Sequence, residues 1–536
     1  MAGLGVVGNM RKVVRIALWS AAALVVGYHA VVEITSISLG EPMGLWETVY
    51  ASIAREWPQQ YQWGHFVLGH DNYGPGYPAF CRPFLLVFSD VYVAHRVANL
   101  VCIVAACVLL AGLLRLNKCR GPITAAVVGI VFAMNAGSYS IQARPDFLVL
   151  LEVTVLLGAG QLAAMGRLSA WRFGLAAGFL ALAAYLTKPY GAFALGATLG
   201  YLWIFGRARY AAVATLTSAV ILLPGVCLYA QANPLYFFET FRAHLAHNDP
   251  NFGWMVHQTA DFVLLGCGLC AAAAAGCFLQ LRRVLQNRGN AGRVTSKTDC
   301  SGYWAWHCIL AAGVLAVGLG WHTGAYLTYY FHLLLVPLCV LAAAFTVPDG
   351  REEPPIWAAG LLLVNLLVLI LVAPPLPQTD TGWVALRDDV RKQRGLVLVD
   401  AVMEPFTRDR PELVLADTGM AAYALHEASL FSPADPRVAR IQGECQAFAK
   451  DWSSWIKEHR PEAIYLDFQV LRNPSGTGPD LIAPRNGLPW FSQAALGDYY
   501  RSELFRIHPY YGATNERRQD AGSWETLIIK LVRKRP

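Results

Sequence analysis

Long apolar segments alternate with short polar connections along the first 375 residues of the chain. Most of them have about 18 to 25 residues, enough to cross roughly 30 Å of hydrocarbon as a helix. Only helices and closed barrels satisfy their backbone in lipid, and these runs are too long and too apolar for barrel strands. The pattern predicts a polytopic α-helical membrane protein with about 11 transmembrane helices, at 13–35, 94–116, 121–139, 146–166, 171–188, 190–206, 210–230, 258–281, 302–320, 326–346 and 355–373.

The pattern changes after Pro374-Pro375, where charged residues become frequent. Short apolar runs of the β type follow, with helix-like stretches at 418–430 and 442–458 between them. Residues 1–375 therefore predict a transmembrane domain, and residues 376–536 predict a small C-terminal α/β extracytoplasmic domain. The expected strands are 396–399, 413–415, 463–466 and 526–529.

Composition agrees with a membrane protein, since 55% of residues are hydrophobic and 15% are charged, against about 25% charged in soluble chains. The net charge of +7 could suggest nucleic acid, but the basic residues lie in short connections, so we expect no nucleic-acid partner. Counted along the predicted spans, 16 of these basic residues lie on the side of the N-terminus and 5 lie on the other side. By the positive-inside rule, the N-terminus is cytoplasmic and the C-terminal domain lies outside.

One connection, residues 37–92, is much longer than a helical bundle needs. It carries acids, many aromatic residues and the turn-rich run Tyr73–Pro78. Within it, 43–57 has apolar residues at four-residue steps, which predicts a helix lying in the membrane interface. Glu41 precedes that helix, where partial loss of hydration would make its carboxylate a stronger base. The alternative is an ordinary acid at a helix start.

Charges at the predicted outer ends of the spans are the other candidates for chemistry. Asp146 opens a span, where the helix dipole alone would favour an acid. Arg144 beside it would suit phosphate binding through its forked guanidinium. Lys188 follows an apolar run, and it is either a lysine reaching to the membrane surface or a ligand of a lipid-linked phosphate.

Aromatic and histidine residues cluster near the same face. Tyr190 and Tyr326 fit either a substrate site or the interfacial aromatic belt. His322 and His332 flank the tyrosines of the tenth predicted span, and histidines of this kind often have structural roles. We find no set of residues with the spacing of a metal site.

These features, in order, resemble the GT-C superfamily of membrane glycosyltransferases, in particular the bacterial protein O-mannosyltransferase and aminoarabinose transferase group. The resemblance lies in an acid after the first span, an interfacial helix, a YGPGYP-type run, an arginine opening the second span, an R-x-D turn and a Thr-Lys-Pro turn. In this sequence they correspond to Glu41, 43–57, Tyr73–Pro78, Arg96, Arg144–Asp146 and Thr187–Pro189. The resemblance is most specific over residues 30–200.

The resemblance implies transfer of a sugar, with inversion, from a polyprenyl-phosphate donor to a lipid, glycan or protein acceptor on the outer face of a bacterial inner membrane. No cofactor is certain, and a divalent cation is an open expectation. The implied catalytic residues are Glu41 as base and Asp146, which would orient the acceptor or a cation. The implied phosphate-binding residues are Arg144, Lys188 and Arg96, and the implied substrate-lining residues are Tyr73, Tyr77, Tyr190, His322 and Tyr326.

Two other functions remain open. A transporter or flippase would need polar residues at mid-membrane and interrupted helices in both halves of the chain, whereas Glu152 is one of few deep acids here. A non-catalytic scaffold would explain an outer domain, but it would leave the long first loop without a purpose.

Overall fold

The computed structural model describes most helices and strands of the chain. Up to Leu371 the described residues form helices, and after Thr381 they form a five-stranded sheet with helices beside it. The described residues are 2–39, 74–119, 121–136, 145–206, 208–233, 252–287, 301–321, 331–346, 356–374, 376, 381–400, 410, 412–416, 433–467, 493–507 and 526–534.

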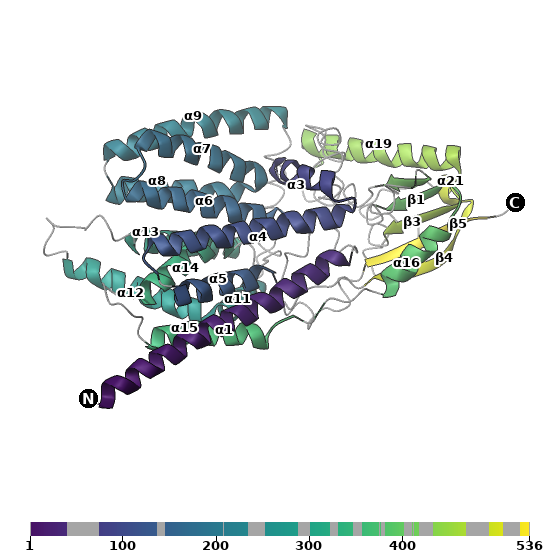
Figure 1. The fold of residues 1–536 in the computed structure, drawn as a ribbon. Coiled ribbons are helices and arrows are strands. Elements are labelled where there is room, and N and C mark those ends of the chain that lie inside the picture. Colours follow the sequence, from purple (N-terminus) through teal and green to yellow (C-terminus); the bar gives the residue numbers. More distant parts are fainter. Residues whose placement is uncertain are drawn as a thin grey trace.

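The helices up to Leu371 lie side by side in a bundle, with the sheet at one end and the N-terminus at the other (Figure 1). Five described helices are long and apolar enough to cross a membrane, or six if a bent pair counts as one span. The predicted number of about 11 spans is not established. The five are α1 (Ala2–Ser38), α4 (Val91–Leu116), α6 (Asp146–Ala164), α7 (Ala170–Thr187) and α9 (Ala208–Ala232).

Shorter helices complete the bundle: α5 (Gly121–Ala136), α8 (Phe193–Phe205), α13 (Ser301–Trp321), α14 (His332–Thr346) and α15 (Ile356–Leu371). α4, α5, α6 and α14 supply much of its buried core. By contrast, α9 exposes Leu216, Val220 and Leu223, at 67%, 70% and 60%. Helices that are apolar on all sides are typical of membrane spans, whose outer face meets lipid.

The predicted span at 258–281 is interrupted in the structure, because the chain bends there by 94° between α11 (Phe252–Leu265) and α12 (Cys267–Asn287). Asn365 of α15 satisfies the backbone that the break frees. Its Nδ2 donates to the Leu265 carbonyl over 2.7 Å, and its Oδ1 accepts from the Leu269 N–H over 3.0 Å. Gly268 permits this packing, since a Cβ there would lie 1.9 Å from the Leu361 carbonyl oxygen.

The predicted turn-type run Tyr73–Pro78 is described from Gly74 onward, and there it enters helix α3 (Gly76–Val87). Its glycines lie against the C-terminal end of α7. A Cβ on Gly74 would lie 2.1 Å from the Leu186 carbonyl oxygen, and one on Gly76 would lie 2.5 Å from Thr187 Oγ1. Two glycines thus allow α3 to approach the backbone of α7 closely.

The C-terminal sheet has strand order β2-β1-β3-β5-β4. β1 (Val397–Asp400) runs parallel to β2 (Leu413–Ala416) and β3 (Ala463–Asp467). β5 (Thr526–Arg533) lies antiparallel between β3 and β4 (Tyr499–Ile507). Four strands coincide with expected runs, whereas β4 was missed.

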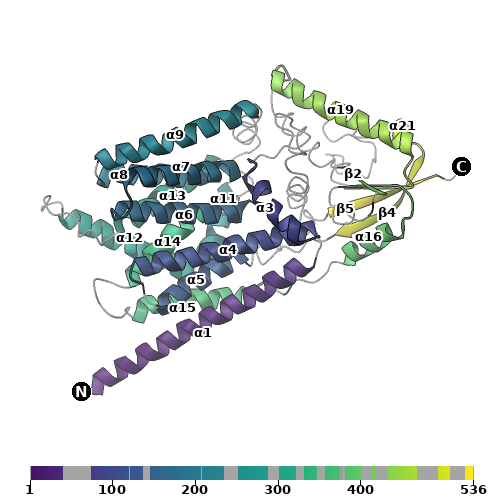
Figure 2. The same ribbon diagram turned by 45° about the horizontal axis from the view of Figure 1, so that its top comes forward.

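Helices cover both faces of this sheet (Figure 2). α16 (Thr381–Lys392) buries Trp383, Leu386 and Val390 against one face. α19 (Pro436–His459), which contains the predicted helix-like stretch 442–458, lies on the other side. The expected helix 418–430 lies outside the described residues, and α21 (Gln493–Leu496) precedes β4.

Candidate active site

A buried ion pair joins α6 and α7 at the end of the bundle that faces the sheet. Lys188 Nζ donates to Asp146 Oδ1 over 2.6 Å, and each residue is only 1% exposed. Burying two charges is costly unless they are paired, so this contact needs an explanation beyond packing.

The local sequence explains how the two charges meet. Asp146 is the first residue of α6 after Pro145, a residue type suited to a helix start. Lys188 ends α7 with an extended backbone (φ −152°, ψ 126°), as expected before Pro189. α6 and α7 pack together and run in opposite directions, so the start of one meets the end of the other.

Tyr190 closes one side of the pair. Its hydroxyl donates to Asp146 Oδ1 over 3.4 Å, and its ring centroid lies 5.8 Å from Lys188 Nζ. The ring is packed against the hydrophobic core and only partly exposed. The described contacts therefore put Tyr190 with the predicted Asp146 and Lys188, at the edge of a shared polar site.

His332, which we did not include among the site residues, also lies here. Its Nε2 is 2.8 Å from Asn135 Oδ1, and its ring centroid is 5.8 Å from that of Phe147. It is 3% exposed, and the charges of Asp146 and Lys188 act on its ring. The only signal in the sequence was its position beside a tyrosine cluster, which does not reveal a contact with residues almost 200 positions earlier.

Arg96 and Tyr77 occupy a neighbouring polar layer. Arg96 is fully buried, donates from Nη1 to the Ser36 carbonyl of α1 over 2.9 Å, and lies over the Tyr92 ring. Tyr77 donates to Asn99 Oδ1 over 3.1 Å, and its hydroxyl lies 3.3 Å from His95 Nδ1. These contacts tie α1, α3 and α4 together, so both residues have a structural role whatever else they bind.

The remaining predicted site residues lie outside the described residues. These are Glu41, Tyr73, Arg144, His322 and Tyr326. Of the described residues, no three or more His, Cys, Asp or Glu side chains form a group that could hold a metal ion.

The comparisons with known proteins give the class of fold first. No family model matches the chain, and no curated protein matches it. Solved structures do match, and what they show is the fold of the chain.

One protein whose fold the chain shares is ArnT of Cupriavidus metallidurans. The structure of ArnT bound to undecaprenyl phosphate matches with a TM-score of 0.56 and 12% identity, over 95% of this chain and 97% of that one. Apo ArnT matches with a TM-score of 0.54 and 12% identity, over 96% and 97%. At this identity the likeness concerns the fold, so the chemistry has to be argued from this chain's own residues.

Proposed function

We propose that the protein is a GT-C glycosyltransferase that moves a sugar from a polyprenyl-phosphate donor to an acceptor outside a bacterial inner membrane. The observation that carries the proposal is the buried pair of Lys188 and Asp146, at the sheet end of a bundle with the ArnT fold. A lipid-linked donor needs a cation at the depth of its phosphate, and Lys188 supplies one at the end of a predicted span. ArnT itself was solved with undecaprenyl phosphate.

The charge balance of the site indicates what else must bind the donor. Because Asp146 neutralises Lys188, the pair as it stands carries no net charge. A phosphate therefore needs further positive charge, and we assign it to Arg144, two residues before Asp146. In this proposal Asp146 holds the lysine side chain in place, and Arg144 supplies the fork that binds phosphate oxygens.

The proposed reaction is an inverting displacement. A carboxylate, which we assign to Glu41, takes the proton of the acceptor hydroxyl as its oxygen attacks the anomeric carbon. The bond from that carbon to the phosphate oxygen breaks, and polyprenyl phosphate leaves with the electron pair. The cations nearby stabilise the negative charge that develops on the leaving phosphate.

The direct test uses purified protein in vesicles with a radiolabelled polyprenyl-phosphate sugar and a membrane extract as acceptor. Wild-type protein should consume the donor, and Glu41→Gln should slow the reaction by about 10²- to 10⁴-fold, as expected for loss of a general base. Arg172→Gln, an exposed change at the opposite end of α7, serves as the matched control.

The outcomes separate the competing functions. Full activity of Glu41→Gln would remove the base assignment but leave the enzyme class intact. If no lipid-linked sugar is consumed and labelled lipid instead changes leaflet, the protein is a flippase. Chelation with EDTA followed by addition of Mg²⁺ or Mn²⁺ decides whether a divalent cation is needed.

A further inference from the structure

Glu152 is a half-buried acid near the candidate site. It lies six residues along α6 from Asp146, about 9 Å at the rise of an α-helix. Its Oε1 is 3.1 Å from the hydroxyl oxygen of Thr187, the residue directly before Lys188. Its other oxygen, Oε2, is buried and has no hydrogen-bond partner. No described cation pairs with it.

The hydrogen atoms at this contact can be counted. Thr187 Oγ1 lies 3.1 Å from Glu152 Oε1 and also 3.0 Å from the Ala183 carbonyl oxygen. Both of these oxygens are acceptors if Glu152 is ionised, yet a hydroxyl has one proton to donate. An ionised Glu152 carboxylate would then compete with the Ala183 carbonyl for the single Thr187 hydroxyl proton. In an apolar bundle, a charge with so little hydrogen bonding is very costly.

A proton on Glu152 gives each oxygen at this contact a hydrogen bond and leaves no buried charge. The acid O–H then donates to Thr187 Oγ1, and the Thr187 hydroxyl donates to the Ala183 carbonyl. The unpartnered Oε2 becomes the carbonyl oxygen of a neutral acid, which costs far less to bury than a charge. The count therefore favours the neutral form.

The same threonine is where three helices meet. Thr187 comes from α7, Glu152 from α6, and Gly76 of α3 lies against the threonine hydroxyl. The next residue is Lys188, whose backbone N–H donates to the Ala184 carbonyl over 2.7 Å. Fixing Thr187 thus fixes the last turn of α7, from which Lys188 reaches Asp146.

We propose that Glu152 is a protonated, neutral positioning residue that holds the Thr187–Lys188 turn in the geometry that the donor phosphate requires. Its effect on the reaction rests on the proposed function, because it acts through Lys188. Its protonation does not depend on that function and can be measured separately.

Infrared difference spectroscopy of the purified full-length protein tests the protonation. At neutral pH the wild-type spectrum should contain a carbonyl stretching band of a protonated carboxylic acid that is missing from Glu152→Gln. A band that shifts when Thr187→Val removes the hydroxyl would assign it to this contact. If the wild-type and Glu152→Gln spectra differ only in carboxylate bands, Glu152 is ionised and the proposal is wrong.

Kinetics test the positioning role, with conservative and disruptive changes at each partner. Glu152→Leu and Thr187→Val should each lower kcat/KM for the lipid-linked donor by about 10- to 100-fold, since small misplacements at a reacting site have effects of this size. The loss should be mainly in KM for the donor. Glu152→Gln and Thr187→Ser should restore it, because both retain the hydrogen bond without a charge.

A matched control separates positioning from general destabilisation. Gln161 is a buried polar residue of α6, hydrogen-bonded to Asn117 over 2.9 Å toward the other end of the helix. Gln161→Leu should lower thermal stability without changing KM for the donor. The positioning role would be wrong if Glu152→Gln were as impaired as Glu152→Leu. It would also be wrong if Glu152→Leu kept the wild-type KM for the donor. Wild-type protein inactive on every donor would instead refute the proposed function and leave the infrared result standing.

Discussion

Lys188 and Asp146 stabilise the bundle only as a pair, because either charge alone would be buried without compensation. Lys188→Met and Asp146→Leu should each lower the free energy of unfolding by about 3–5 kcal/mol. The double variant should lose less than either single change, since two apolar side chains leave no charge behind. Thermal unfolding in detergent measures this. Equal losses that simply add in the double variant would mean that the two residues do not interact.

Tyr465 of β3 makes a comparable buried contact in the sheet. Its hydroxyl donates to Asp389 Oδ2 over 2.6 Å, and Lys530 Nζ lies 2.6 Å from the same oxygen. Burial, together with this hydrogen bond and the charge of Asp389, raises the pKa of Tyr465 far above its usual value. Tyr499 of β4 behaves similarly, since burial raises its pKa to about 12.

These tyrosines make the sheet sensitive to alkaline pH. Their contribution is complete below the unfolded pKa of about 10. Above it, the unfolded chain loses protons that the folded chain keeps, so stability falls as pH rises. Tyr465→Phe should be less stable at pH 8 by about 1.5–3 kcal/mol, and its stability should decline less between about pH 9 and 11.

Urea titration of the full-length protein, monitored by hydrogen exchange of the sheet, measures the difference in stability between Tyr465→Phe and wild type at each pH. Tyr500→Phe is the control, because Tyr500 of β4 is 52% exposed and should behave like wild type. An equally steep alkaline decline in Tyr465→Phe would show that Tyr465 does not titrate in this way.

The contact of α3 with the end of α7 depends on glycine. In Gly74→Ala the new Cβ would meet the Leu186 carbonyl, a backbone atom that cannot rotate away. We expect a loss of about 1–3 kcal/mol and lower transferase activity, because α3 lies against the turn that carries Lys188. Gly196→Ala in α8 is the control, since no atom lies within 4 Å of its new Cβ. Thermal unfolding and activity are measured for both, and equal behaviour would contradict the close approach.

Elements also differ in how far their sequence predicts them. β1, β2, β3 and β5 each contain a short uninterrupted apolar run, so their positions could be predicted. β4 (YYRSELFRI) mixes apolar and charged residues, and it lies at the sheet edge next to β5 alone. The bend at Gly266 was missed because Asn365, which stabilises it, lies about a hundred residues further along the chain.

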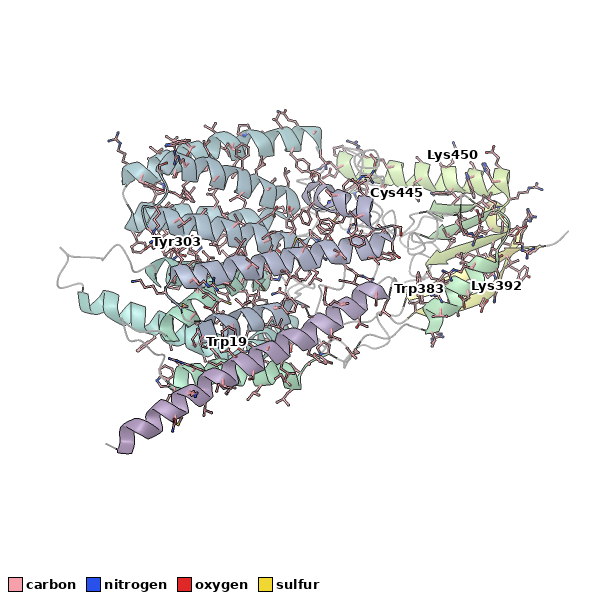
Figure 3. All side chains as sticks on the ribbon, in the orientation of Figure 1. Trp19, Tyr303, Trp383, Lys392, Cys445 and Lys450 are labelled. Atoms are coloured by element: carbon pink, nitrogen blue, oxygen red, sulfur yellow. The ribbon has the colours of Figure 1, made fainter. Side chains whose placement is uncertain are left out.

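At the level of the molecule, the sheet and the N-terminus lie at opposite ends of the bundle (Figure 1). Lys450, on α19, belongs to the sheet end (Figure 3) and is exposed. We predict that this end is extracytoplasmic. In a Cys227→Ser/Cys300→Ser background, Lys450→Cys should react in intact cells with a membrane-impermeant maleimide.

Cys300 gives the opposite control, because we predict from the sequence that it is cytoplasmic. In a Cys227→Ser background it should react with the maleimide only after the membrane is permeabilised. The reverse labelling pattern would invert the orientation and move the candidate site to the cytoplasmic face.

The sequence by itself determined the class of fold, because a helix that crosses lipid needs a long apolar segment that no soluble fold requires. It also indicated Asp146 and Lys188, since charges at the ends of apolar spans are expensive and rarely accidental. The partners of those charges came from the tertiary structure alone. Lys188 meets Asp146 across 42 residues, Thr187 meets Glu152 across 35, and His332 meets Asn135 across 197. Such contacts depend on which helices pack together and on how they are shifted along their axes. The local hydrophobic pattern does not encode either of these.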